Sequence, residues 1–339
     1  MRSRVSFGFF RDAFKKIIVQ ADDHRRTFRG YRLYGMDGLE LVLPRTQDIL
    51  DNGCVGKAVG QYRESHYPRM YVLHCYDVLS EVTKAVEYSN QNQELSMAEK
   101  IIPTLEEKSI SLYDRAFPSG RLIIAHKDAG NGFIARLSTA SFKEAVRLLK
   151  LKIKRRVTVI EGVKIRFIKI KNPKTGEYAL FMTNLPAYWV DDQTITQLYG
   201  LRWEVENSFR DWVDTHKIEQ WHSKKMNGIL QEFFASLWLV NYTRIQILLE
   251  SHEKQIDPLN TEYEKPNFKL ILDTVIGRLR ELFTHGPMAL AETIQRLIKR
   301  TTAKRKRRSR SYKRVLRGSP SPYTYDNQVW GPQVAGVVN

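Results

Sequence analysis

A strand–helix–strand succession in the middle of the chain limits the fold more than any other feature. The run 109-SISLYDRAF-117 is typical of a buried strand with an acid near its end, 119-SGRLIIAHKDA-129 predicts a helix, and 132-GFIARLS-138 predicts another strand. Such alternation is characteristic of α/β proteins, in which helices cover a sheet. With 339 residues and 42% hydrophobic content, the chain can bury a full core and is expected to form two or three structural units.

Further strands are predicted on the amino-terminal side of this succession. Residues 31–44 hold two short alternating runs around Asp37-Gly38, which predicts a β-hairpin. The β-branched and aromatic run 69–79 suits a buried third strand, with 81–88 a possible fourth. A helix is expected over 96–108.

The carboxyl-terminal half changes pattern twice. Residues 142–184 alternate with period two and carry many Lys and Arg residues, which indicates a small β-rich insertion. Helical patterns follow over 191–215 and 227–252, and a pair of amphipathic helices is expected over 268–298.

The net charge of +18 and the pI of about 9.8 favour a polyanionic partner, either nucleic acid or an anionic membrane. A membrane is the weaker option, because the most apolar run, 235–249, is interrupted by Asn241 and Arg244. Residues 299–317 are basic with almost no apolar content. We expect this tail to be disordered when free and to bind nucleic acid by releasing counterions from phosphates.

Cysteine and histidine usage argues against a zinc site or a disulfide scaffold. Cys54 and Cys75 are the only cysteines, and none of the eight histidines stands in an HExxH motif or beside a CxxC pair. The amino-terminus has no apolar segment of a secretion signal. A cytoplasmic protein is therefore expected.

Acidic residues at strand ends are the candidate catalytic groups. Phosphoryl transfer commonly uses two hard divalent ions, and three carboxylates from different elements can hold both. Asp114 ends a predicted central strand, where α/β proteins place ligands. Asp37 also has a purely structural interpretation, because Asp-Gly favours a hairpin turn in any protein. Asp77 also ends a strand, and its neighbours do not decide for or against it.

The stretch 199-YGLRWEVENSFRDWV-213 places a carboxylate between arginines at helical spacing. Tyr199 and Arg202 precede Glu206 by seven and four residues and Arg210 follows it by four, so all four are expected on one helical face. One interpretation is a solvated ion-pair ladder. The other is a metal-binding acid whose neighbours bind phosphate, Arg by bidentate hydrogen bonds and Tyr by its hydroxyl.

Together these segments resemble DDE transposases of bacterial insertion sequences, in particular the group named for its Y-REK signature. That signature is Tyr, two residues, Arg, three residues, Glu, six residues, Lys, and Tyr199, Arg202 and Glu206 match it. MDGLELVLP and SLYDRAF are similar to the family's two aspartate segments, and 230-LQEFFASLWLVNYTRIQIL-248 is similar to the helix after its glutamate. The resemblance spans roughly 31–250.

The resemblance implies an α/β fold: an RNase-H-like mixed sheet flanked by helices, with a β-rich insertion and a helical carboxyl-terminal region. The implied divisions are a residual helical segment at 1–30, a catalytic core at 31–140 and 185–252, the insertion at 141–184, a helical region at 253–298 and a basic tail at 299–339.

The resemblance also implies a chemistry. Asp37, Asp114 and Glu206 are expected to bind two Mg²⁺ ions, for which Mn²⁺ can substitute. The protein is expected to cut DNA at transposon ends and to join the freed 3′-hydroxyl to target DNA, acting as a homodimer associated with the nucleoid. DNA contacts are expected from the residues around the glutamate: Tyr199, Arg202, Arg210 and Lys217.

The sequence departs from the family pattern in two ways. Val213 stands at the signature Lys position, and Arg210 or Lys217 could replace that contact. Asp37 lies near the start, whereas relatives carry a helical domain before it, so a shortened copy is expected. Two alternatives stay open: an inactive DNA-binding remnant, and a nuclease of the same fold that only hydrolyses.

Overall fold

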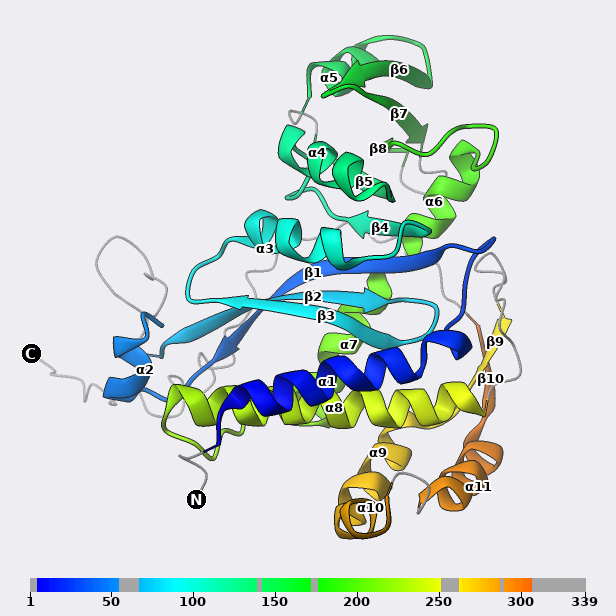
Figure 1. Ribbon diagram of the computed structural model, residues 1–339. Coiled ribbons are helices and arrows are strands. Elements are labelled where there is room, and N and C mark those ends of the chain that lie inside the picture. Colours follow the sequence, from blue (N-terminus) through cyan, green and yellow to red (C-terminus); the bar gives the residue numbers. More distant parts are fainter. Residues whose placement is uncertain are drawn as a thin grey trace, which may run out of the picture.

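The computed structural model describes residues 5–54, 67–138, 142–171, 176–250, 262–286 and 290–306, and it is built on one mixed eight-stranded sheet. The strand order is β3-β2-β1-β4-β5-β8-β7-β6 (Figure 1). The bounds are β1 (Arg32–Val42), β2 (Arg69–Asp77), β3 (Val82–Ser89), β4 (Ser109–Tyr113), β5 (Gly132–Leu137), β6 (Arg155–Ile160), β7 (Val163–Lys171) and β8 (Tyr178–Thr183). A separate two-stranded ribbon pairs β9 (Glu262–Lys265) with β10 (Ala303–Lys306).

Helices cover both faces of the sheet. They are α1 (Phe7–Gln20), α2 (Gln47–Asp51), α3 (Glu94–Ile101), α4 (Gly120–Ala129), α5 (Lys143–Lys150), α6 (Asp192–Gly200), α7 (Trp203–Arg210), a π-helix (Asp211–Thr215), α8 (Met226–Leu249), α9 (Phe268–Gly277), α10 (Leu279–His285) and α11 (Ala291–Thr301), with 3₁₀ turns at Asp22–His24 and Ile102–Thr104. The core on one face includes side chains of α3, α4 and α5, and the cores on the other face include those of α1, α6, α7 and α8. Helix α1 runs alongside α8 (Figure 1). Among the described residues, no helix combines the length and apolar content that crossing a membrane requires.

The strand directions define the fold class. Strands β1, β2 and β3 form an antiparallel meander, whereas β4 pairs in parallel with β1, and β5 in parallel with β4. The parallel pairs need crossover connections, and α3 and α4 supply them. This mixed sheet with flanking helices confirms the α/β, RNase-H-like fold expected from the resemblance.

The hairpin predicted at Asp37-Gly38 is wrong, because β1 is a single long strand through both residues. Asp37 pairs with His74 and Gly38 with Leu73 of β2. The glycine serves a close approach rather than a turn: a Cβ added at Gly38 would lie 2.1 Å from a carboxylate oxygen of Glu94. Composition alone does not separate these two uses of glycine.

The alternating region after α5 extends the main sheet. Strand β8 pairs antiparallel with β5, and β7 and β6 follow it outward to the sheet edge. Strands β8 and β7 are each paired on both sides, so the ladder satisfies their backbone groups, whereas β6 is paired only with β7 among the described strands. The division of the chain into core and insertion stays a prediction.

Two expectations for the carboxyl-terminal part need correction. The predicted helix pair over 268–298 is three helices, α9, α10 and α11. Disorder was expected from residue 299, but α11 continues to Thr301 and residues 303–306 form β10, whose backbone pairs with β9. The remainder of the basic tail, 307–339, lies outside the described residues.

Candidate active site

The fold brings two of the predicted acids level with each other on neighbouring strands. The parallel register pairs Gly35 of β1 with Leu112 of β4, so Asp37 and Asp114, each two residues further on, are level with each other. Asp37 lies within β1, whereas Asp114 directly follows the end of β4. Both side chains are partly exposed, as a binding site for solute requires.

Helix α7 places the third acid, Glu206, over the same part of the sheet. A close contact with β1 makes this possible: a Cβ added at Gly35 would lie 2.2 Å from Cγ2 of Val205. The absence of a side chain at Gly35 therefore lets α7 approach the strand that carries Asp37.

Arg202 joins two of the acids directly. Its Nη1 donates to Oδ2 of Asp37 at 2.7 Å, and its Nη2 donates to Oε1 of Glu206 at 2.9 Å. The residue is only 5% exposed. Burial disfavours its charge, but Tyr199, Asp37 and Glu206 together raise the pKa of Arg202, so the guanidinium stays charged. The i,i+4 pair expected from the sequence is present, and Asp37 is the partner that the sequence did not indicate.

A fourth carboxylate, Glu94 at the start of α3, lies near the strand acids. Burial raises its pKa first, and the negative charges of Asp37, Asp114 and Glu40 raise it further. Burial likewise raises the pKa of Asp37; Arg202 opposes this shift and Asp114 adds to it. Glu94 was not predicted from the sequence, and the local signal for it is the glycine at 38 against which its side chain packs.

The side chains offer oxygen donors, which suit hard divalent ions such as Mg²⁺ or Mn²⁺. Among the described residues, no three His, Cys, Asp or Glu side chains are grouped closely enough to hold a metal ion. The mutual repulsion of Asp37 and Asp114 is nevertheless the electrostatic situation that a cation relieves. The donors therefore fit a divalent ion chemically, provided that Arg202 gives up its contacts with Asp37 and Glu206.

The residues predicted to contact DNA are spread over two helices and a turn. Tyr199 lies on α6, separate from α7, and is 7% exposed, with its ring 5.1 Å from that of Phe181. Burial raises the pKa of Tyr199, and the neighbouring charge of Arg202 opposes this. Arg210 is exposed near the end of α7 and donates to Asn207. Lys217 is exposed in the turn after the π-helix.

The signature Lys position, occupied by Val213, lies on the π-helix that follows α7. Residues 211–215 form a wider turn than an α-helix, which changes the face on which the following side chains lie. Val213, at the position of the signature Lys, packs against the core that contains Trp212. Counting residues from Glu206 at α-helical spacing therefore does not predict the direction of the Val213 side chain.

Asp77, which the sequence left undecided, has a structural role. Its side chain is fully buried, and Arg25 bonds to it at 2.8 Å. Its other oxygen accepts hydrogen bonds from the backbone N–H groups of Leu79 and Ser80, at 3.2 and 3.0 Å. These bonds use both carboxylate oxygens to fix the turn between β2 and β3.

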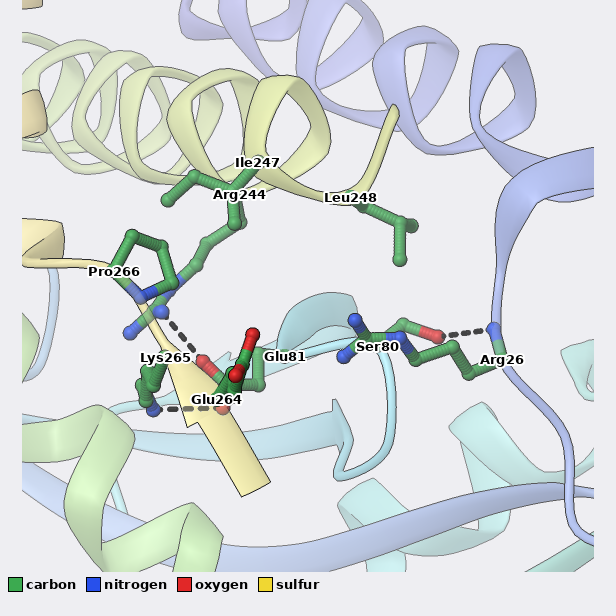
Figure 2. A pocket seen from close by; sticks show the side chains of 9 residues that line it. All are labelled: Arg26, Ser80, Glu81, Arg244, Ile247, Leu248, Glu264, Lys265 and Pro266. Carbon is green, nitrogen blue, oxygen red and sulfur yellow. Dashed lines mark hydrogen bonds and ion pairs between the residues drawn. The ribbon is translucent and has the colours of Figure 1, made fainter. Parts of the chain in front are cut away.

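A pocket lies at this turn, and the residues that line it, among them Ser80 and Glu81, include none of the three acids (Figure 2). Glu81 of the turn forms ion pairs with Arg244 of α8 and with Lys265 of β9, the latter at 2.7 Å. Despite burial, these two cations lower the pKa of Glu81 to about 2. Arg244 also pairs with Asp211 of the π-helix. The pocket is thus bordered by a network that anchors the end of α7 to α8.

A mixed α/β sheet with carboxylates on β1, after β4 and on a helix above them defines an RNase-H-like protein with an acidic site. Residues 36–242 match the family model described as the transposase DDE domain. That range is more than half of the chain, so the protein belongs to this family. The resemblance to insertion-sequence transposases is confirmed.

Individual relatives are more distant. The chain is 27% identical over 67 residues to the transposase for insertion sequence element IS231E of Bacillus thuringiensis subsp. finitimus, a match that covers 20% of this chain and 14% of that protein. It is also similar to the piggyBac transposase in a synaptic complex with hairpin DNA, with 13% identity and a TM-score of 0.46. That match covers 91% of this chain and 59% of the other.

Proposed function

We propose that this protein is a metal-dependent transposase that cuts DNA at transposon ends and joins the freed 3′-hydroxyl to target DNA. The observation that carries the proposal is the Arg202 bridge, which brings Asp37 and Glu206 together beside Asp114. All three acids lie inside the range that matches the family model. The three acids are far apart in the sequence, so only the fold brings them close to one another.

The proposed chemistry consists of two in-line displacements at phosphorus. In cleavage, a water oxygen attacks the phosphodiester and the 3′-oxygen leaves; in joining, that 3′-hydroxyl attacks a target phosphodiester and expels its 3′-oxygen. Bound divalent ions, which the family generally uses, supply Lewis-acid activation of the attacking and leaving oxygens. Asp37, Asp114 and Glu206 would hold them, with Mg²⁺ as the expected ion and Mn²⁺ as its substitute.

The charge of the protein supports DNA as the partner. The net charge of +18 favours a polyanion. Arg202 stays charged beside the two acids, and a cation in this position would also attract a phosphate. Arg210 is exposed at the end of α7 and Lys217 beyond it, so we propose that the DNA lies along this helix and that a homodimer acts across paired ends within the nucleoid.

The test uses labelled DNA that carries the ends of the encoding element, with Mg²⁺ or Mn²⁺. Joined products support the transposase, cut products alone indicate the nuclease alternative, and a band shift alone indicates a DNA-binding remnant. Glu206→Gln is expected to abolish cleavage while keeping most DNA affinity. The matched control is Glu204→Gln on the same helix, where Glu204 accepts from Asn207 at 3.0 Å. Cleavage that survives Glu206→Gln removes this residue from the site.

A further inference from the structure

We propose that His74 is a positioning residue that sets α7, and with it Arg202 and Glu206, against the strand that carries Asp37. Its consequence for catalysis rests on the proposed function. His74 stands on β2 directly across from Asp37 in the antiparallel register. Its ring is fully buried, with Nδ1 3.2 Å from Oγ of Ser208 and Nε2 3.0 Å from Oγ1 of Thr83. Ser208 lies on α7, two residues beyond Glu206.

The partners determine which ring nitrogen carries the proton. The hydroxyl of Ser208 donates to the backbone carbonyl of Val205 at 2.6 Å, so its oxygen accepts from Nδ1–H of His74. Nε2 then has a free lone pair, which accepts from the hydroxyl of Thr83. Burial lowers the pKa of His74 to about 3, in agreement with a neutral ring at physiological pH. Each hydrogen bond from Thr83 through His74 and Ser208 to the carbonyl of Val205 therefore has a defined direction.

The hydrogen bonds continue from Thr83 to α8, and we call the whole set, from Ser208 through His74 and Thr83 to Asn241, the relay. Asn241 accepts from the backbone N–H of Thr83 and donates to its carbonyl, both at 2.9 Å. The four side chains are at most 4% exposed: Ser208, His74, Thr83 and Asn241. An apolar interface tolerates small shifts of a helix, whereas a shift of α7 large enough to break these hydrogen bonds would leave a buried donor or acceptor without its partner. The relay thus favours a single position of α7.

Aromatic packing fixes the ring itself. Trp212, on the π-helix that follows α7, has its ring centroid 4.3 Å from that of His74. Phe209 lies 5.6 Å away. The wide turn of the π-helix thus places Trp212 against the histidine, and the segment after Glu206 is held from both sides. A displacement of about 1 Å in an active site can cost roughly 100-fold in rate, so this rigidity matters for Glu206.

The experiment removes the hydrogen bonds of the relay and measures metal binding as well as cleavage. Ser208→Ala deletes the hydrogen bond between His74 and α7, whereas Ser208→Thr keeps the hydroxyl. His74→Phe keeps an aromatic ring but removes its nitrogens. Thr183→Val is the matched control, because Thr183 on β8 is also fully buried and donates to the carbonyl of Phe133 at 2.6 Å. Mn²⁺ affinity is read by electron paramagnetic resonance, DNA affinity by gel shift and folding by circular dichroism.

We expect Ser208→Ala and His74→Phe to weaken Mn²⁺ binding roughly tenfold and to slow cleavage by a larger factor, with unchanged DNA affinity. Ser208→Thr should keep Mn²⁺ affinity and the cleavage rate near their wild-type values, and Thr183→Val should leave Mn²⁺ affinity unchanged. Wild-type Mn²⁺ affinity in folded Ser208→Ala, or an equal loss in Thr183→Val, overturns the positioning role. His74→Phe that does not fold leaves the milder serine pair to decide.

The same measurements separate this inference from the proposed function. If Mn²⁺ binding is lost in Asp37→Asn but not in Ser208→Ala, only the positioning role fails. If the wild-type protein binds no Mn²⁺, or binds it equally well after Asp37→Asn, the proposed metal site fails, and the role of His74 fails with it.

Discussion

Replacement of Arg202 by Gln is expected to destabilise the metal-free protein and to make it respond more strongly to divalent ions. The change removes the hydrogen bonds to Asp37 and Glu206 and the positive charge that lies between these two carboxylates. The Arg202 side chain is 7% exposed and that of Asp37 21%, so this contact counts as a largely buried charged hydrogen bond, worth about 1.5–3 kcal/mol. The side chain of Glu206 is 37% exposed, so its contact counts at the surface value of about 0.5 kcal/mol.

These contributions give a loss of about 2–3.5 kcal/mol in the free energy of unfolding. At roughly 2 °C per kcal/mol for a chain of this size, Tm in EDTA should fall by about 4–7 °C. An ion that binds between Asp37 and Glu206 must displace the guanidinium in the wild type but not in the variant. Mn²⁺ should therefore bind the variant more tightly, and each tenfold gain in affinity adds about 1.4 kcal/mol of stability at saturating ion.

The assay is thermal unfolding in EDTA and across a Mn²⁺ titration. Arg244→Gln is the control, since Arg244 also bridges two carboxylates, Glu81 and Asp211, but lies in the separate network near β9. It should lose stability without a larger Mn²⁺ effect. The reasoning is refuted if Mn²⁺ raises Tm of Arg202→Gln no more than that of the wild type, or raises Tm of Arg244→Gln equally.

Glu94→Gln should raise Tm at pH 8 by roughly 1–3 °C, because it removes a charge that repels the strand acids; a lower Tm would instead assign Glu94 to stabilising the start of α3. Burial lowers the pKa of His74 to about 3 and that of His126 to about 4. Both take up a proton on unfolding below pH 6.5, so stability should fall as the pH drops from 6.5 towards 4, and a flat unfolding profile over this window contradicts the assignment. Truncation after Lys306 keeps α11 and β10 but removes the six Lys and Arg residues of 307–317, which should lower the salt slope of DNA binding by up to about five; an unchanged slope in gel-shift titrations would leave the tail without a role in binding.

Much of the architecture could be predicted from the sequence because its signals are local. The run before Asp114, the helix after it and the next strand follow from apolar periodicity, and β4, α4 and β5 appear where that periodicity places them. The signature residues Arg202 and Glu206 were also found by spacing, since an i,i+4 pair needs only one helix. The net charge likewise follows from the sequence alone, because it is obtained by counting charged residues.

Contacts between distant segments decided the remainder. Gly38 favours a turn when considered with its neighbours alone, yet the side chain of Glu94 from α3 makes it a point of close approach within β1. Val213 lies on a π-helix and packs against the core that contains Trp212, and α-helical spacing from Glu206 does not predict this. The sequence by itself determined the central strands and helices, the charge and the acids available to a site. Only the tertiary structure decided that Arg202 lies between Asp37 and Glu206, because a contact between residues so far apart in the chain leaves no periodicity or spacing to detect.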